Sequence, residues 1–231
     1  MPLNYARRHP SAVLLIAQLS AFLLYPLMER SPQSRTLFGV FGLLVLGLVL
    51  RVIRKTPWQT WVGVVLALPV VLMALASLFI PRSPELTGAI AAFQAAVYFY
   101  AAGSLITHIL EDTVATTDDL LAAGATFTLL GWAFAYVFVA LQAVSPGSFA
   151  VPGAVEATRS WLELLYLSVI VLSSVGLSDV IPATPFARGL VMLEAFIGVF
   201  YMALVVSRLI GLIAAKRQRA TQEVPRVPRT E

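Results

Sequence analysis

Residues 172–179 read Leu172-Ser173-Ser174-Val175-Gly176-Leu177-Ser178-Asp179, and this polar stretch separates two strongly hydrophobic segments. An apolar run begins at residue 161 and leads into it, and a longer run, residues 186–215, follows it. In a bilayer, non-helical backbone is tolerated only where protein buries it or where it lines a water-filled path. The polar stretch therefore predicts a pore lining.

The composition is typical of a membrane protein that crosses the bilayer several times. Of the 231 residues, 59% are hydrophobic and 12% are charged, and the charged share is about half of the roughly 25% found in soluble domains. The chain has no cysteine, which excludes disulfides and thiolate metal sites. No run of Lys and Arg is interleaved with aromatic residues, so we expect no nucleic-acid partner.

Apolar windows of spanning length, about 20 residues, recur along the chain between prolines, serines and charged residues. They cover residues 11–28, 36–53, 58–80, 86–110, 120–144 and 186–215. A further apolar run, residues 161–172, is too short to span and predicts a re-entrant helix. The predicted fold class is an all-α polytopic membrane protein with six transmembrane helices and one re-entrant pore helix.

Basic residues near the span ends predict the orientation. Three groups of them fall on one side if six helices alternate: Arg7 and Arg8, then Arg51, Arg54 and Lys55, then Lys216, Arg217 and Arg219. Because this side is richer in Lys and Arg than the other, we expect both termini in the cytoplasm and the chain in the cell (inner) membrane. The re-entrant helix then enters from outside.

The segment around the polar stretch resembles a known family. Residues 166–179 read YLSVIVLSSVGLSD, which is similar to the pore helix and selectivity filter of potassium channels, whose bacterial members carry Tyr-Phe-Ser-x-x-Thr-Leu-Thr-Thr-Val/Leu-Gly-Tyr-Gly-Asp. The resemblance covers roughly residues 113–212. It implies a potassium-channel-like pore built by a homotetramer in the lipid bilayer, with an outer helix, pore helix, filter and inner helix in residues 116–215. The implied permeant ion is a monovalent cation, K⁺, with Na⁺ left open.

Carbonyl oxygens of a narrow extended strand can replace the hydration water of a cation. The resemblance implies a filter made of Ser174, Val175, Gly176, Leu177, Ser178 and Asp179. Gly176 takes a left-handed conformation at little cost, whereas Ser178, at the place of the second filter glycine, would pay about 1–2 kcal/mol. Leu177 replaces the filter tyrosine and has no hydroxyl to brace the strand. We therefore predict intact inner sites, a widened or differently folded outer half, and weakened potassium selectivity.

Three charged residues are expected to support the filter from behind. Glu163 lies in the short helix, with Arg159 four residues before it as a local partner. Glu194 lies within the last span, where ionisable groups are costly and usually functional or paired. Arg188 precedes it and is a candidate partner. Contact of Glu194 with the permeant cation stays open as the alternative.

Three more residues have two readings each. Asp179 either concentrates cations at the mouth through a ring of negative charge, or has a structural role in which it pairs with Arg188 or caps a backbone amide. Gly198 resembles the gating hinge glycine of channel inner helices, and close helix packing is the alternative. Arg208, near the inner end of the last span, is expected to reach the cytoplasmic interface or to pair with an acid.

Residues outside the pore segment predict two further parts. Residues 1–115 form a four-helix N-terminal membrane domain without voltage-sensor charges, because the span at residues 86–110 contains no Lys or Arg. Residues 216–231 form a basic, disordered cytoplasmic tail.

No enzyme is predicted. The chain has no His-Glu-x-x-His pair, no Gly-x-Ser-x-Gly turn and no phosphate-binding Gly-x-x-x-x-Gly-Lys loop, so we expect no catalytic residue, no cofactor and no metal beyond permeant cations. Two alternatives to a cation channel stay open. One is a non-conducting channel-like subunit. The other is a secondary transporter, although such folds usually show paired broken helices and this chain has one re-entrant element.

Overall fold

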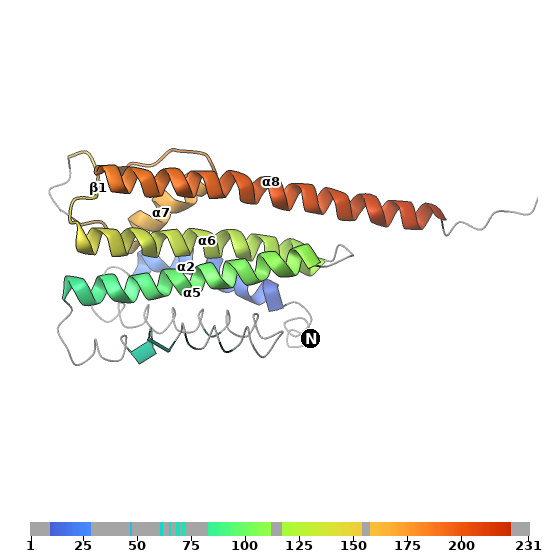
Figure 1. The fold of residues 1–231 in the computed structure, drawn as a ribbon, viewed down its shortest axis with the longest axis horizontal. Coiled ribbons are helices and arrows are strands. Elements are labelled where there is room, and N and C mark those ends of the chain that lie inside the picture. Colours follow the sequence, from blue (N-terminus) through green and yellow to red (C-terminus); the bar gives the residue numbers. More distant parts are fainter. Residues whose placement is uncertain are drawn as a thin grey trace, which may run out of the picture.

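The structure is a computed structural model that describes residues 10–28, 83–111, 117–153 and 158–222, with a few isolated positions between 47 and 72. In these residues it contains five helices (Figure 1): α2 (Pro10–Met28), α5 (Pro84–Glu111), α6 (Thr117–Val144), α7 (Trp161–Leu172) and α8 (Pro185–Gln222). Two short strands, β1 (Phe149–Ala150) and β2 (Ile181–Pro182), pair antiparallel. The spans predicted at residues 36–53 and 58–80 lie almost wholly outside the described residues.

Three of the described helices are long and apolar enough to cross a membrane, over Pro84–Leu110, Asp118–Val144 and Pro185–Arg208. The apolar part of α2, Ser11–Leu24, is shorter. The six spans expected from the sequence are therefore not all found in the described part of the chain. The remaining helix, α7, has the predicted bounds of the short apolar run, because Arg159 and Ser160 precede the apolar pattern and Ser173 and Ser174 follow it.

The last helix is longer than expected. It continues to Gln222, seven residues past the predicted end at residue 215, so residues 216–222 are helical where a disordered tail was predicted. Six of these seven residues are Ala, Lys, Arg or Gln, which are strong helix formers, and the seventh is Thr221. Positive charge is also favourable near the negative end of the helix dipole. In Figure 1 this part of α8 projects past the ends of α5 and α6.

Small residues allow α5 and α6 to pack closely as an antiparallel pair. Alanines are buried on both helices, among them Ala91, Ala95 and Ala102 on α5 and Ala125 and Ala133 on α6. Within a bilayer the hydrophobic effect does not drive helices together, and small residues let their backbones approach closely enough for van der Waals packing. Tyr98 and Tyr136 stack across this interface with their ring centroids 5.6 Å apart.

Helix α2 packs on another side of α6. A Cβ added at Gly124 would lie 3.1 Å from the Leu15 side chain, so the glycine lets α2 approach. Thr128 donates a hydrogen bond to Gln18 at 2.6 Å, and both side chains are buried. The first described helix therefore rests directly on the helix that precedes α7.

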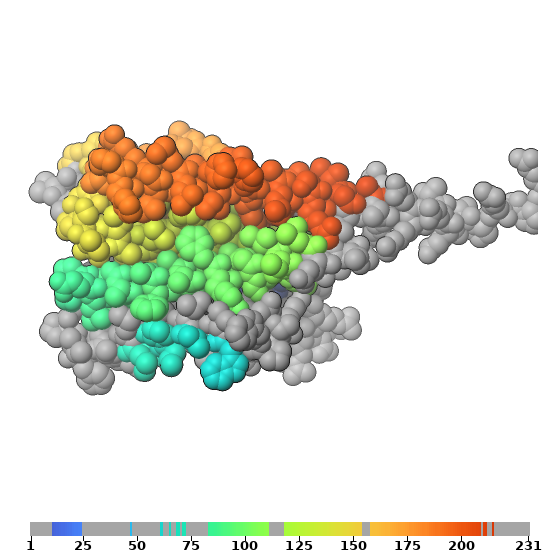
Figure 2. Space-filling view, viewed as in Figure 1, coloured from blue at the N-terminus to red at the C-terminus, as the bar shows by residue number. Residues whose placement is uncertain are grey.

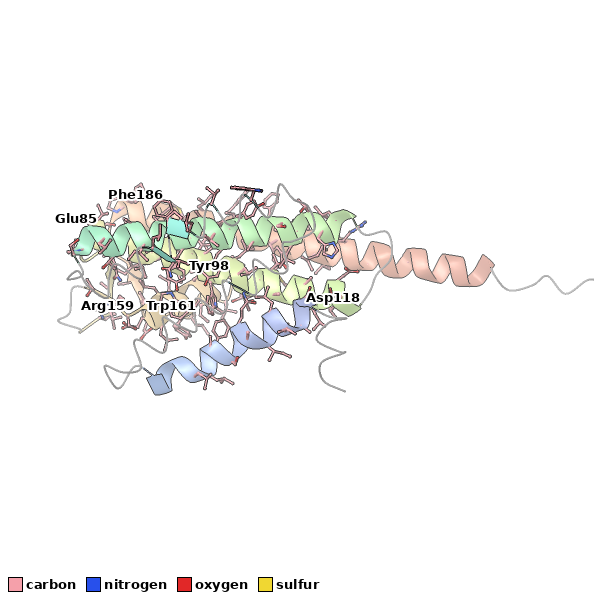
Figure 3. The ribbon with its side chains drawn as sticks, turned by 90° about the horizontal axis from the view of Figure 1, so that it is seen from below. Glu85, Tyr98, Asp118, Arg159, Trp161 and Phe186 are labelled. Atoms are coloured by element: carbon pink, nitrogen blue, oxygen red, sulfur yellow. The ribbon has the colours of Figure 1, made fainter. Side chains whose placement is uncertain are left out.

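The ends of the helices place α7 between α6 and α8. Figure 3 shows Glu85, Arg159, Trp161 and Phe186 toward one end of the helix bundle, and Asp118 toward the opposite end, beyond which α8 continues. The chain thus enters α7 at the end where α8 begins, runs inward, and returns to that same end to start α8. Phe134, Phe138, Phe149 and Leu164 form a buried cluster that holds α7 in place.

Candidate ion-conduction site

The N-terminus of α7 is fixed by a capping box. Ser160 accepts a hydrogen bond from the Glu163 amide at 3.3 Å, and the Glu163 carboxylate accepts one from the Ser160 amide at 2.6 Å. Arg159 forms an ion pair with Glu163, with 3.6 Å between Nη1 and Oε1. Glu163 therefore starts the helix, at the opposite end of α7 from the polar stretch.

A buried glutamine joins this cap to α6. Gln142 donates to the Arg159 carbonyl at 2.8 Å and accepts from the Arg159 amide at 2.9 Å. On the other side, the Ala183 amide donates to the Ser148 carbonyl at 2.8 Å, beside the β1–β2 pair. The segment that contains α7 is thus tied to the last turn of α6 at one end and to the turn that follows α6 at the other.

The C-terminus of α7 determines the start of the polar stretch. The amides of Ser174 and Val175 donate to the carbonyls of Val171 and Ile170 at 2.9 and 3.1 Å, which is the Schellman pattern of helix ends. Its left-handed position is Ser174, with φ of 60°. Glycine usually occupies this position, and another residue pays about 1–2 kcal/mol there.

The backbone handedness alternates only over the inner half of the polar stretch, which we define as residues 173–176. Ser174 and Gly176 have φ of 60° and 71°, and Val175 between them is not left-handed. Among the described residues no other non-glycine residue has a positive φ, so the strain expected at Ser178 is not found. The reason is that hydrogen bonds to α7 impose the left-handed turn at Ser174, whereas the described part of the chain shows no such bond from the Ser178 amide.

Side chains hold the outer half, which we define as residues 177–179. The Tyr166 hydroxyl, on α7, donates to the Leu177 carbonyl at 2.8 Å. Ser178 accepts from the Val180 amide at 3.1 Å. The sequence showed that Leu177 lacks a hydroxyl, but it did not show that Tyr166 supplies one from behind. Asp179 is exposed and makes no ion pair within the described residues.

Behind the polar stretch, Glu194 meets α7 and α6. Its carboxyl group is hydrogen-bonded to Ser168, whose hydroxyl also lies 2.9 Å from the Gly131 carbonyl. Glu194 and Ser168 are both 0% exposed. Arg188 does not join this group: its Nε donates to the Pro182 carbonyl at 3.2 Å.

Gly198 lies four residues beyond Glu194 and packs against the end of α7. A Cβ added there would lie 2.9 Å from the Leu172 carbonyl carbon, 3.0 Å from its Cα, and nearer still to its oxygen. No side chain fits at such distances. The helix continues without a break through this position, so the structure accounts for the glycine by close packing, and the hinge stays a prediction.

Further along α8, Arg208 binds the end of α5. Its guanidinium donates to the carbonyls of Ile109 and Leu110 at 3.2 and 2.8 Å. These carbonyls belong to the last turn of α5, where they have no partner within the helix, and the positive charge also suits the helix dipole. The sequence suggested an interface or an acid as the partner and gave no signal for this cap.

Much of α8 is exposed and apolar. Met192, Phe196, Phe200 and Ile210 are each more than half exposed, as are Val175 and Leu177 in the polar stretch. Figure 2 shows α8 along the edge of the molecule on the side away from α5. Lipid or another protein must cover such a surface.

Comparison with known proteins decides the family. A family model described as an ion channel matches residues 96–215, just over half of the 231-residue chain. The chain belongs to this ion channel family. The family is the two-helix-pore, potassium-channel-like one, which confirms the resemblance seen in the sequence. The match includes α6, α7, the polar stretch and the whole apolar part of α8, so the protein is a membrane protein with an ion channel domain. No curated protein and no solved structure matches the chain.

Proposed function

We propose that the chain is one subunit of a homotetrameric channel that lets monovalent cations flow passively across the cell (inner) membrane. The observation that carries this proposal is the path of residues 161–185. Helix α7 enters and the chain returns at the same end of the molecule, so the polar stretch lies between α7 and α8. In a membrane this path makes α7 a re-entrant pore helix and the polar stretch a lining for water and ions.

The tetramer follows from the number of pore segments. One chain contributes one polar stretch, and a ring of carbonyls around a cation needs several copies. Four copies are required if the geometry of potassium channels holds. The exposed apolar surface of α8 and the exposed Val175 and Leu177 supply faces for such contacts.

The proposed membrane topology has six spans, one re-entrant helix and cytoplasmic termini. Residues 1–115 are the N-terminal membrane domain and residues 116–215 the pore domain. The basic residues 216–231 lie in the cytoplasm, with residues 216–222 as the helical end of α8. The excess of Lys and Arg on this side supports the orientation.

The proposed channel selects only weakly for K⁺ over Na⁺. Alternating handedness turns successive carbonyls the same way, and it extends only over Ser174, Val175 and Gly176. The Leu177 carbonyl is engaged by Tyr166 on α7, so it is directed toward the pore helix. Selectivity for K⁺ over Na⁺ depends on the number and field strength of the coordinating carbonyls. A filter with fewer carbonyl rings therefore discriminates less between the two ions.

A liposome flux assay with purified protein tests the function. We expect both K⁺ and Na⁺ flux in the wild type, and a higher K⁺/Na⁺ ratio in the double variant Leu177→Tyr/Ser178→Gly. A wild-type reversal potential that follows K⁺ alone would refute weak selectivity. A stable monomer in detergent would refute the tetramer, and a tetramer without flux would identify the non-conducting subunit instead.

A further inference from the structure

The contact among Ser168, Gly131 and Glu194 joins the three helices of the pore domain. Ser168 comes from α7, Gly131 from α6 and Glu194 from α8. The side chains of Ser168 and Glu194 are fully buried within one protomer, so their arrangement does not depend on a neighbouring subunit. This contact also lies one helical turn from the Leu172–Gly198 contact on both α7 and α8.

Counting protons assigns a donor to each of the two hydrogen bonds. A serine hydroxyl has one proton to donate, and a backbone carbonyl can only accept. If Ser168 donates to the Gly131 carbonyl, its bond to Glu194 needs a second proton. An ionised carboxylate cannot supply one, but a neutral carboxylic acid can. Both bonds are therefore made only when Glu194 carries the proton and Ser168 accepts it.

The surroundings of Glu194 favour the same state. Its second oxygen, Oε2, is buried and has no hydrogen-bond partner in the described residues. A buried charge without partners is far more costly than a neutral group. Charged side chains on the same three helices, as far as the structure describes them, lie or bind elsewhere: Asp118 contacts Ser11, Glu163 contacts Arg159, Arg188 contacts the Pro182 carbonyl, and Arg208 contacts the end of α5. Asp119 lies in the first turn of α6, more than three turns before Gly131.

We propose that Glu194 is held as a neutral carboxylic acid and donates its proton to Ser168, and that this bond positions α8 against α7 beside the inner half of the polar stretch. Loss of the proton would leave two acceptors, Gly131 and Glu194, competing for the one proton of Ser168. Helix α8 would then lose its polar bond to the pore helix one turn above the Gly198 contact. The effect on conduction rests on the channel function proposed above, whereas the protonation state does not.

Infrared difference spectroscopy of the full-length protein in lipid tests the protonation state. Subtracting the spectrum of Glu194→Gln from that of the wild type at neutral pH should leave the carbonyl band of a protonated carboxylic acid, which shifts in D₂O. Glu163→Gln is the matched control, because Glu163 accepts from Ser160 and pairs with Arg159, so its difference spectrum should contain carboxylate bands. A wild-type minus Glu194→Gln spectrum with carboxylate bands alone would overturn the proposal.

Cation flux in liposomes tests the positioning role. Glu194→Gln keeps a donor and should conduct as the wild type does. Glu194→Leu keeps a side chain of similar bulk without a donor, and Ser168→Ala removes the acceptor, so both should lose flux. Equal flux from Glu194→Gln and Ser168→Ala would overturn this role. This comparison does not need the Glu194→Leu variant, so it decides the question even if that variant does not fold. A wild type without flux would refute the channel function, and the infrared result would still decide the state of Glu194.

Discussion

In the inner half of the polar stretch backbone amides hold the chain, whereas in the outer half side-chain hydroxyls hold it. The amides of residues 173–176 all donate to carbonyls of the last turns of α7. The outer half instead depends on Tyr166, which binds the Leu177 carbonyl, and on Ser178, which binds the Val180 amide. The place where α7 ends therefore shapes the inner half, and individual side chains shape the outer half. Substitutions in the outer half can therefore change the proposed pore lining without changing the helix that supports it.

Gly198→Ala should give the largest effect, because it acts on the end of α7 from which the inner half starts. The new Cβ would meet the Leu172 backbone, which cannot move aside as a side chain would. Overpacking of this kind costs about 1–3 kcal/mol. We expect a lower thermal unfolding temperature in detergent and loss of cation flux.

Gly189→Ala is the matched control, since nothing lies within 4 Å of a Cβ added there and the residue belongs to the same helix. This variant should be as stable as the wild type or slightly more stable, because Ala favours helix by about 1 kcal/mol over Gly. Equal stability and flux for the two alanine variants would show that α8 does not support the inner half at Gly198.

The helix bounds could be predicted from the sequence, and the contacts between helices could not. Run length, polar interruptions and proline placed α7 at its observed bounds, α5 and α6 close to theirs, and the start of α8 within one residue, because each signal is local; the end of α8 was predicted seven residues too early. The Glu194–Ser168 and Arg208–Leu110 contacts join positions 26 and 98 residues apart, and no pattern within one helix specifies them. Strain was expected at Ser178 from its place in the family motif. It occurs at Ser174 because the hydrogen bonds that end α7 impose the left-handed turn there.

A pair of glycine substitutions tests whether the two halves differ in strain. Ser174→Gly should stabilise the protein by about 1 kcal/mol, since glycine adopts the left-handed conformation without the cost that serine pays. Ser178→Gly should give no gain, because Ser178 is not left-handed and glycine adds freedom to the unfolded chain. Thermal unfolding of the two variants in the same detergent measures the difference. Equal shifts would remove the distinction between the halves.

Tyr166→Phe acts on the outer half alone. It deletes the hydroxyl that donates to the Leu177 carbonyl, a bond that contributes about 0.5–1.5 kcal/mol at most, and less here because the site is exposed. We expect a changed K⁺/Na⁺ flux ratio with little change in thermal stability. Tyr201→Phe is the control: it removes a buried bond to the Ala123 carbonyl, away from the polar stretch, so it should lower stability and leave the ratio unchanged. An unchanged ratio in Tyr166→Phe together with a changed ratio in Tyr201→Phe would show that the Tyr166–Leu177 bond does not control selectivity.

Arg208→Gln tests whether the shape of the polar stretch depends only on contacts close to it. The change removes the charge that binds the last carbonyls of α5, and charge at a helix C-terminus contributes about 0.3–1 kcal/mol. Because Arg208 lies more than two turns beyond Gly198 on α8, the Glu194 and Gly198 contacts should stay in place. We therefore expect a small loss of thermal stability and an unchanged K⁺/Na⁺ ratio. A changed ratio would mean that the inner half depends on the whole length of α8, and that hydrogen bonds to α7 alone do not determine its shape.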